Sequence, residues 1–161
     1  MKTIEHWIGG KPTSGTSERT APVWNPATGQ QQSEVRLASK SDVDGAIVTA
    51  RTAFEQWSQA SLSQRSKVLF AFRELVNNNI EALAELITDE HGKVLSDAAG
   101  EVQRGLEVVE FACGIPHLLK GDYSDQVSTN VDSYSFREPL GVVAGITPFN
   151  FRSWCRCGCI R

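Results

Sequence analysis

Helical periodicity runs through the middle of this sequence and constrains its fold more than any other feature. Apolar residues recur at spacings of three and four in successive blocks, at about residues 43–57, 68–76, 80–91 and 95–119. Ser41 is the expected N-cap of the first helix, because Asp42 and Asp44 then fall in its first turn. Gly92 suits the left-handed position that follows the third helix. The pattern predicts four amphipathic helices.

Strand-like segments flank these helices on both sides. The first forty residues are rich in turn signals, and the short pieces His6–Ile8 and Ala21–Trp24 favour small hairpins or a meandering edge. After the helices, alternating residues at Gln126–Thr129 and Ser133–Arg137 also predict strands. The apolar run Val142–Ile146 is short and is bounded by glycine and proline, as is typical of a buried parallel strand. The sequence therefore predicts an α/β fold.

Composition narrows the possible partners and the compartment. Among the 161 residues, 16 Lys and Arg stand against 19 Asp and Glu, which gives a formal charge of -3. A nucleic-acid partner is not expected, because no broad cationic surface is available to neutralise phosphates. The start has no charged segment followed by a run of about 7–15 apolar residues, and no stretch approaches roughly 18 apolar residues. We expect a cytoplasmic protein with no membrane partner.

One segment, from Arg137 to Phe151, carries most of the chemical information. Its apolar run leads into Pro148, and Asn150 is then expected at the carboxyl end of a sheet strand, where α/β proteins bind their ligands. An amide there can stabilise an oxyanion that develops on a carbonyl group, an effect worth about 3–4 kcal/mol. In the alternative reading, the segment is a turn in which Asn150 bonds its own backbone.

The pieces Pro139–Val143 and Ile146–Phe151 resemble the strand that leads to the conserved amide of the aldehyde dehydrogenase superfamily. The resemblance covers residues 4–151. It implies that Asn150 belongs to the oxyanion hole and that Thr147 and Phe149 lie against the nicotinamide end of NAD. The chain is then expected to hold an incomplete amino-terminal part of that fold, with helices and the first strands of a Rossmann-like NAD-binding domain and part of the oligomerisation arm.

Further stretches are similar to the methylmalonate-semialdehyde branch of the superfamily. They are Trp7–Lys11, Glu90–Ala98, Arg104–Cys113 and the Phe that precedes Asn150. That branch oxidises malonate and methylmalonate semialdehydes with NAD and passes the acyl group to coenzyme A. The resemblance also implies a homo-oligomeric enzyme with a small semialdehyde as substrate.

Arg104 is the candidate partner for the substrate carboxylate. Its position matches the family position for that role, and the planar guanidinium can bind both carboxylate oxygens at once. In the alternative reading, Arg104 is a solvated helical residue that pairs with Glu101 or Glu107. His6, His91 and His117 are far apart in the sequence and imply no metal set.

The last ten residues, 152–161, depart from the family pattern and contain Cys155, Cys157 and Cys159. A zinc module is a poor reading, because these cysteines lack the usual ligand gaps and a fourth ligand. A shift of the reading frame is another explanation of this tail, because the codons of Trp and Cys restrict what the shifted frame would encode. Shifting the frame back by one base forces Val at the junction of Trp154 and Cys155, and permits a segment that resembles the family continuation. We therefore expect that one base was lost after the Phe151 codon.

Residues 1–151 are thus predicted to be a partial NAD-binding domain, and residues 152–161 an aberrant tail. The family nucleophile is a Cys that none of the four present cysteines matches, and Cys113 is expected to be a buried helical thiol. We expect no turnover and marginal stability for the chain alone, since a lone parallel strand leaves backbone groups unpaired. The alternative is a non-catalytic fragment that binds an intact dehydrogenase subunit.

Overall fold

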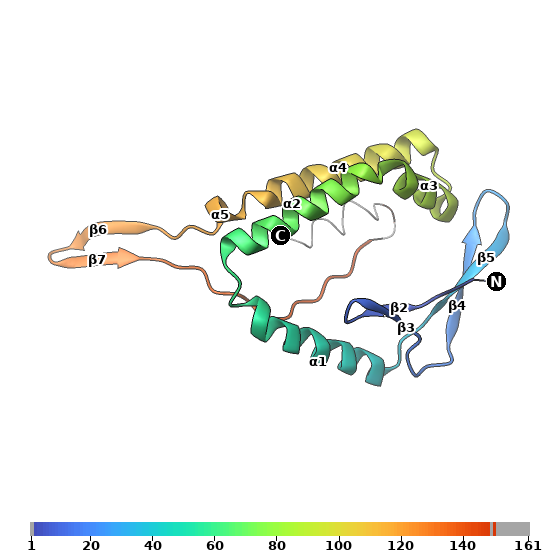
Figure 1. The fold of residues 1–161 in the computed structure, drawn as a ribbon, viewed down its shortest axis with the longest axis horizontal. Coiled ribbons are helices and arrows are strands. Elements are labelled where there is room, and N and C mark those ends of the chain that lie inside the picture. The colour runs from blue at the N-terminus through green and yellow to red at the C-terminus, as the bar shows by residue number, and fades with distance from the viewer. Residues whose placement is uncertain (1, 149, 151–161) are drawn as a thin grey trace.

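The computed structural model describes residues 2–148 and 150 and has the mixed α/β composition that the sequence predicts (Figure 1). Short strands come first, helices follow, and a two-stranded hairpin comes last. In chain order the elements are β1 (Lys2–Ile4), β2 (His6–Ile8), β3 (Lys11–Thr13), β4 (Thr20–Asn25), β5 (Gln30–Arg36), α1 (Lys40–Trp57), α2 (Leu62–Asn78), α3 (Ile80–His91), α4 (Leu95–Cys113), α5 (Ile115–Leu118), β6 (Tyr123–Ser128) and β7 (Val131–Tyr134).

The amino-terminal strands form two small sheets. In the first, β5 lies in the centre, pairs parallel with β1 and pairs antiparallel with β4. In the second, β2 and β3 make a tight hairpin. The turn between β4 and β5 is fixed by Asn25, whose side chain accepts hydrogen bonds from the backbone of Ala27 and Thr28 at 2.9 and 3.3 Å. The expected hairpins at His6–Ile8 and Ala21–Trp24 are confirmed.

The N-cap of helix α1 lies two residues earlier than predicted. Ser39, not Ser41, caps the helix: its hydroxyl accepts from the Asp42 backbone N–H at 3.1 Å, while the Asp42 carboxylate accepts from the Ser39 backbone N–H at 2.8 Å. This reciprocal capping box needs an acceptor side chain three residues after the cap, and Asp42 has that spacing from Ser39. The prediction of Ser41 was therefore wrong.

Helices α2, α3 and α4 pack together and form the main core of the described chain. Ser61 and Gln64 make a second capping box at the start of α2, and Gly92 ends α3 with a φ of 77° in the left-handed region, as predicted. The buried apolar residues come from α3 and α4: Ala84, Ile87, Ala98, Val102, Leu106, Val109, Ala112 and Cys113. No helix in the described part of the chain is long and apolar enough to cross a membrane.

The predicted fourth helix is shorter than expected. It ends at Cys113, and after Gly114 the chain continues as the separate short helix α5. Pro116 explains the interruption, because proline has no N–H to donate to the preceding turn and is tolerated only near a helix start. Phe111 was expected among the apolar contacts of this helix, but half of its surface is exposed.

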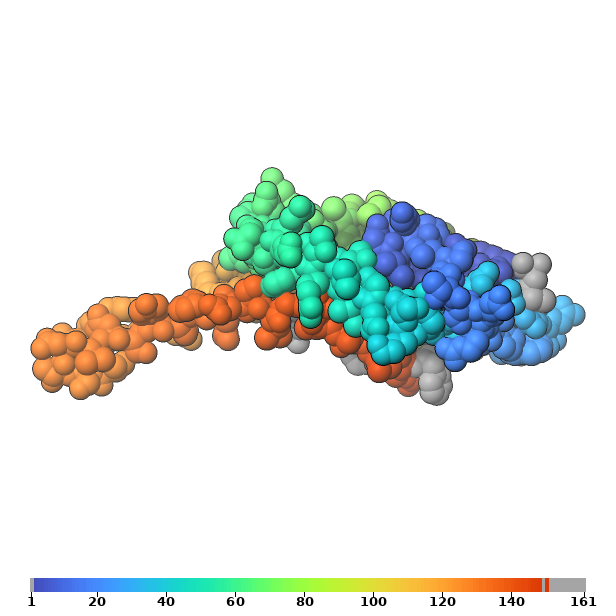
Figure 2. Space-filling model, turned by 90° about the horizontal axis from the view of Figure 1, so that it is seen from below, coloured from blue at the N-terminus to red at the C-terminus, as the bar shows by residue number. Residues whose placement is uncertain are grey.

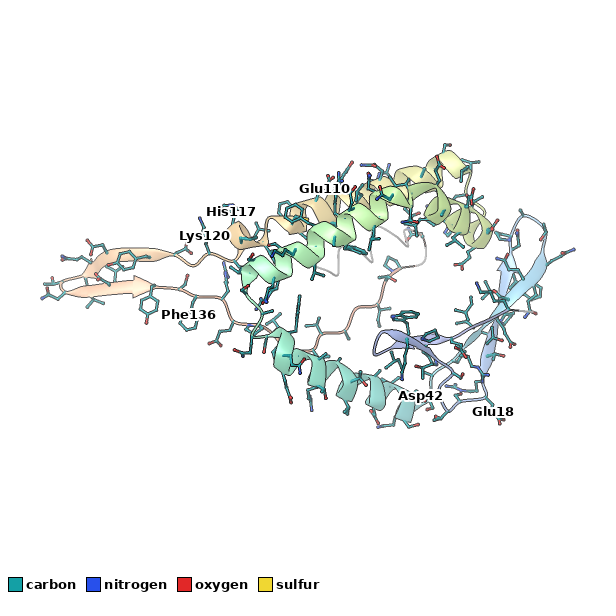
Figure 3. The ribbon with its side chains drawn as sticks, in the orientation of Figure 1. Glu18, Asp42, Glu110, His117, Lys120 and Phe136 are labelled. Atoms are coloured by element: carbon teal, nitrogen blue, oxygen red, sulfur yellow. The ribbon has the colours of Figure 1, made fainter. Side chains whose placement is uncertain are left out.

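Strands β6 and β7 form an antiparallel hairpin that projects from the body of the molecule (Figure 2). Every residue of both strands is exposed. Figure 3 shows His117 and Lys120 where the chain enters the hairpin and Phe136 where it returns. The two strands are therefore exposed to water along their whole length and pack very little against the helices.

The chain after the hairpin corrects the prediction of a buried parallel strand at Val142–Ile146. This segment has no strand structure, and the Ile146 side chain is fully exposed. A parallel strand requires a neighbouring strand to receive its hydrogen bonds. No strand within residues 2–148 pairs with this segment. Its apolar sequence is suited to burial, but the described residues do not supply a sheet.

Candidate active site

The residues predicted to carry chemistry lie at the end of the segment that returns from the hairpin. This segment runs back toward the helices and α1 and reaches Asn150 (Figures 1 and 2). Thr147 is half-buried and Asn150 is exposed. Phe149, the third predicted residue, lies outside the described residues. The structure therefore describes Thr147 and Asn150 within one short, irregular stretch.

Asn150 is attached to the helical layer through its backbone. Its carbonyl oxygen accepts a hydrogen bond from the Lys93 Nζ at 3.1 Å. The Asn150 side-chain amide makes no hydrogen bond with any described residue; the backbone that follows it, to which the turn of the alternative reading would bond, lies outside the described residues. An exposed amide whose backbone is held can donate to an external carbonyl oxygen.

Lys93 and Glu101 form a partly buried ion pair behind this backbone contact. The Lys93 Nζ lies 2.9 Å from the Glu101 Oε2, and the two side chains are 15% and 2% exposed. Lys93 follows the left-handed Gly92 at the end of α3, and Glu101 is on the second turn of α4. The turn between the two helices thus brings an ammonium group to a carboxylate and to the candidate active-site segment.

This ion pair was not predicted from the sequence, although a signal for it was present. The buried stripe of α4 includes Ala98, Val102 and Gly105. Glu101 stands three residues after the first of these and four before the last, so it lies on the same helix face. A charged residue inside a buried stripe requires a partner of opposite charge or a shifted pKa. The sequence pattern therefore predicts that Glu101 is in the interior and that a cation lies beside it.

Arg104 is exposed on α4, one helical turn beyond Glu101. It makes no ion pair with Glu101 or Glu107, or with any other described residue. The acidic partner suggested by the alternative reading is instead bound to Lys93. Three residues of helix correspond to a rise of about 4.5 Å, so Arg104 lies close along α4 to Glu101, the partner of the lysine that holds the Asn150 backbone.

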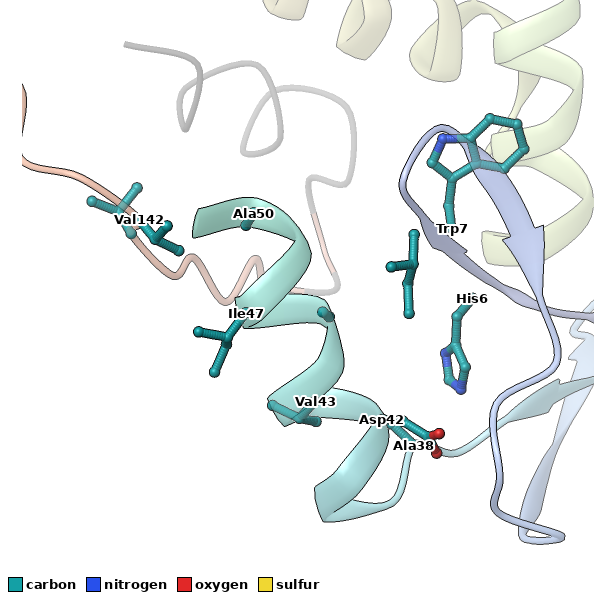
Figure 4. Close-up of a pocket in the computed structure, with 11 residues that line it drawn as sticks. His6, Trp7, Ala38, Asp42, Val43, Ile47, Ala50 and Val142 are labelled. Carbon is teal, nitrogen blue, oxygen red and sulfur yellow. The ribbon is translucent and has the colours of Figure 1, made fainter. Parts of the chain in front are cut away.

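A hollow beside α1 is lined by residues from three parts of the chain (Figure 4). Val142 and Val143 come from the segment before Asn150, and β2 and α1 complete the lining. Most of these side chains are apolar, with His6 and Asp42 as the polar members. Figure 4 shows Val142 on one side of α1 and His6 on the other. This lining favours contact with apolar groups rather than a reaction.

The described cysteine is unsuited to nucleophilic attack. Cys113 is buried at the end of α4, and burial raises the pKa of its thiol, with the nearby Glu110 carboxylate adding to the effect. A raised pKa keeps the sulfur protonated and weakly nucleophilic. No set of three His, Cys, Asp or Glu side chains in the described part of the chain could hold a metal ion. Cys155, Cys157 and Cys159 lie outside the described residues.

Similarity to known proteins gives this site a family. The profile of the aldehyde dehydrogenase family matches residues 13–156. Malonate-semialdehyde dehydrogenase 3 of Geobacillus kaustophilus is 44% identical over 156 residues, which cover 97% of this chain and 32% of that protein. The chain therefore spans about a third of the length of the curated relatives it matches.

Solved structures agree with the sequence comparison. The crystal structure of methylmalonate-semialdehyde dehydrogenase from Oceanimonas doudoroffii has a TM-score of 0.92 and 44% identity, covering 98% of this chain and 32% of that one. A protein of Sinorhizobium meliloti, provisionally assigned as a methylmalonate-semialdehyde dehydrogenase and solved with NAD, has a TM-score of 0.91 and 43% identity over the same shares. The predicted family and the predicted partial fold are confirmed. This chain belongs to the aldehyde dehydrogenase family.

Proposed function

We propose that this chain carries part of the active site of an NAD-dependent, coenzyme A-acylating dehydrogenase of malonate and methylmalonate semialdehydes. The observation that supports the proposal most strongly is the 44% identity to a malonate-semialdehyde dehydrogenase over 97% of this chain. In the overall reaction, a semialdehyde, NAD and coenzyme A give acetyl-CoA or propionyl-CoA, reduced NAD and carbon dioxide. The substrate is accordingly a small aldehyde that bears a carboxylate.

Asn150 has the central chemical role in this proposal. Its side-chain amide donates a hydrogen bond to the aldehyde oxygen as negative charge develops there during attack on the carbonyl carbon. Two features support this role: the amide makes no hydrogen bond with the described residues, and the Asn150 backbone is held by Lys93. An exposed amide without a hydrogen bond to the described residues can donate to an external acceptor.

Arg104 and Thr147 have binding roles. The exposed Arg104 guanidinium, which makes no ion pair within the described residues, would bind both oxygens of the substrate carboxylate. Thr147, half-buried and three residues before Asn150, would hold the nicotinamide end of NAD together with Phe149. When bound, NAD supplies a hydride acceptor. The hydroxyl of Thr147 suits the polar edge of a nicotinamide.

A chimera tests the proposal directly. Residues 4–151 replace the matching stretch of the malonate-semialdehyde dehydrogenase of Geobacillus kaustophilus, and NAD reduction is followed with malonate semialdehyde and coenzyme A. We expect an active chimera, in which Asn150→Ala lowers kcat by about 100- to 1000-fold because a transition-state hydrogen bond is lost. An Asn150→Ala chimera with unchanged kcat would contradict the oxyanion role.

The same chimera tests Arg104 with a matched control. Arg104→Met is expected to raise KM for malonate semialdehyde by about 10-fold or more, as the loss of a charge-assisted hydrogen bond implies, and to leave a neutral aldehyde unaffected. Arg51→Met removes another exposed helical arginine, on α1, and should change neither constant. Equal effects of both variants on KM would contradict the proposed role of Arg104 in substrate recognition.

For the 161-residue chain by itself, we propose no turnover. The chain spans about a third of its relatives, and the described cysteine is a buried thiol with a raised pKa. NAD reduction is measured with the purified chain, malonate semialdehyde and coenzyme A. Production of reduced NAD above a no-protein control would show that the chain is sufficient for the reaction.

The second candidate function is that of a non-catalytic subunit that binds an intact dehydrogenase. The described chain favours it through the apolar side chains that it leaves exposed on α1 and on the hairpin, among them Ile47, Trp57, Val127 and Tyr134. Size-exclusion chromatography of the chain mixed with the full enzyme separates the two cases. Co-elution supports a binding fragment, and separate elution excludes one.

The nature of residues 152–161 is also a proposal, since they lie outside the described residues. A lost base after the Phe151 codon accounts for the cysteine-rich tail, whereas the family profile matches as far as residue 156. The nucleotide sequence after the Phe151 codon shows whether a base was lost there or the tail is encoded as written. A dehydrogenase reading frame in the neighbouring frame supports the loss, and its absence refutes it.

A further inference from the structure

Lys93 joins two oxygens that come from distant parts of the chain. Its Nζ donates to the Glu101 carboxylate at 2.9 Å and to the Asn150 carbonyl oxygen at 3.1 Å. Lys93 and Asn150 are separated by 57 positions in the sequence. The single ammonium group therefore couples the α3–α4 turn to the segment that carries the candidate oxyanion donor.

The energetics of the ion pair argue for a positional role. Glu101 is almost entirely removed from water, and burying a charged pair costs desolvation energy that its mutual attraction only roughly offsets. In proteins generally, replacing such a pair by apolar residues of similar size is often neutral or stabilising. A buried pair of this kind is therefore better explained by the geometry that it imposes on its neighbours than by stability.

We propose that Lys93 is a positioning residue for Asn150 and that the buried Glu101 fixes the direction in which its ammonium donates. The proposal rests on the proposed oxyanion role of Asn150. The Asn150 carbonyl is bonded to the same Cα that carries the side-chain amide. Holding this oxygen restricts the backbone torsion at that Cα, and this sets the position from which the side chain extends.

Lysine suits this position because its ammonium has three donors arranged tetrahedrally. One donor serves the carboxylate and a second serves the carbonyl, along different directions. Methionine has a similar length and an apolar end, so Lys93→Met removes both bonds with little change in volume. Glu101→Gln retains the shape of the acceptor side chain and removes its charge.

Nuclear magnetic resonance of the full 161-residue chain tests the proposal without requiring turnover. In the unchanged chain, Overhauser contacts are expected between the Lys93 ε-methylene protons and Asn150. In Lys93→Met, the Asn150 carbonyl 13C resonance should move upfield because the carbonyl loses its hydrogen bond. The order parameter of the Asn150 backbone amide should fall from about 0.85 to below about 0.6. Lys67→Met, a change at an exposed lysine on α2, should leave the Asn150 signals unchanged.

The double variant Lys93→Met with Glu101→Gln covers the case in which the single variant fails to fold. It removes both members of the buried ion pair together and should reproduce the Asn150 changes. Absence of the Overhauser contact, or Asn150 signals unaltered in a folded variant, would overturn the proposal. Failure of the proposed function would appear instead as an inactive chimera, with the Asn150 resonances still dependent on Lys93.

Discussion

Helices α1 and α4 are similar in length and apolar periodicity, but they differ completely in burial. Eight residues of α4 are buried, and Val102, Leu106 and Val109 have at most 2% of their surface exposed. No residue of α1 is buried, and Val43 and Ile47 are each more than 40% exposed. A periodic apolar face thus identifies the side of a helix suited to a core, whereas burial depends on which elements lie against it.

The neighbours of the two helices explain the difference. Helix α4 packs against α2 and α3, and its face meets Ala84 and Ile87 from α3. Helix α1 is held mainly at its amino-terminal end, where Thr16 donates to Asp42 through both its backbone N–H and its hydroxyl. Stability should therefore depend on side-chain packing in α4 and on end contacts and helix propensity in α1.

The largest effect is expected from truncation of the α4 core. Leu106→Ala removes a fully buried side chain and leaves a cavity, which should lower the free energy of unfolding by about 2–5 kcal/mol. Urea denaturation followed by circular dichroism measures this change. Ile47→Ala is the matched control on α1 and should cost less than about 0.5 kcal/mol. Equal losses in the two helices would contradict the comparison.

A smaller effect is expected from the cap of α1. Ser39→Ala removes the side-chain acceptor of the capping box and should destabilise α1 by about 1 kcal/mol. Hydrogen exchange of the amides in the first two turns of α1 reports the loss. Ser41→Ala, at the position first predicted as the cap, should have less than half this effect. A stronger effect at Ser41 would restore that prediction.

Gly45→Ala should stabilise α1 by up to about 1 kcal/mol, because glycine is a poor helix former and a methyl group there meets open space. Slower amide exchange along α1 is the expected observation. Gly92→Ala is the opposing control: it has a φ of 77°, and its added carbon would lie 2.8 Å from a Pro26 side-chain carbon. That variant should lose stability, since its backbone conformation is costly for alanine.

The smallest effect concerns the pH dependence of α1. Hydrogen bonds from the Ser39 backbone, then from the Ser39 and Thr16 groups, hold the pKa of Asp42 well below its usual value. A depressed pKa in the folded state gives stability that is present above the unfolded pKa of about 3.9 and is lost as the pH falls below it. Helicity of α1 should therefore decrease in acid. Asp42→Asn should lower the helicity at neutral pH and weaken this acid dependence, and a parent chain without any acid loss would refute the prediction.

Much of the fold was predictable because local rules decide helix ends. The sequence predicts α3 to the residue, since its pattern stops at His91 and Gly92 accepts the left-handed conformation that follows. The prediction of Ser41 was wrong because only Ser39 stands three residues before Asp42, the spacing that a capping box requires. The division of the last predicted helix at Gly114 was also visible in Pro116.

The candidate site, like the fold, has a part that was predictable from the sequence and a part that was not. Asn150, Thr147 and Arg104 were proposed from their motifs, and the structure supplies their burial and contacts without testing their roles. The bond from Lys93 to Asn150 was not predictable, because 57 positions separate the two residues and only the return of the chain after the hairpin to the α3–α4 turn brings them together. Long-range contacts of this type leave no periodic signal in a sequence.

By itself, the sequence determined the α/β composition, the helices with their apolar faces, and a resemblance to aldehyde dehydrogenases that the comparisons confirm. These properties follow from local spacing and from motifs within one stretch of chain. The tertiary structure decided which apolar faces are buried, that Val142–Ile146 forms no strand, and that Lys93 lies between Glu101 and Asn150. Each of these depends on elements distant in sequence, because burial and ion pairing require a neighbour and a neighbour is provided only by the fold.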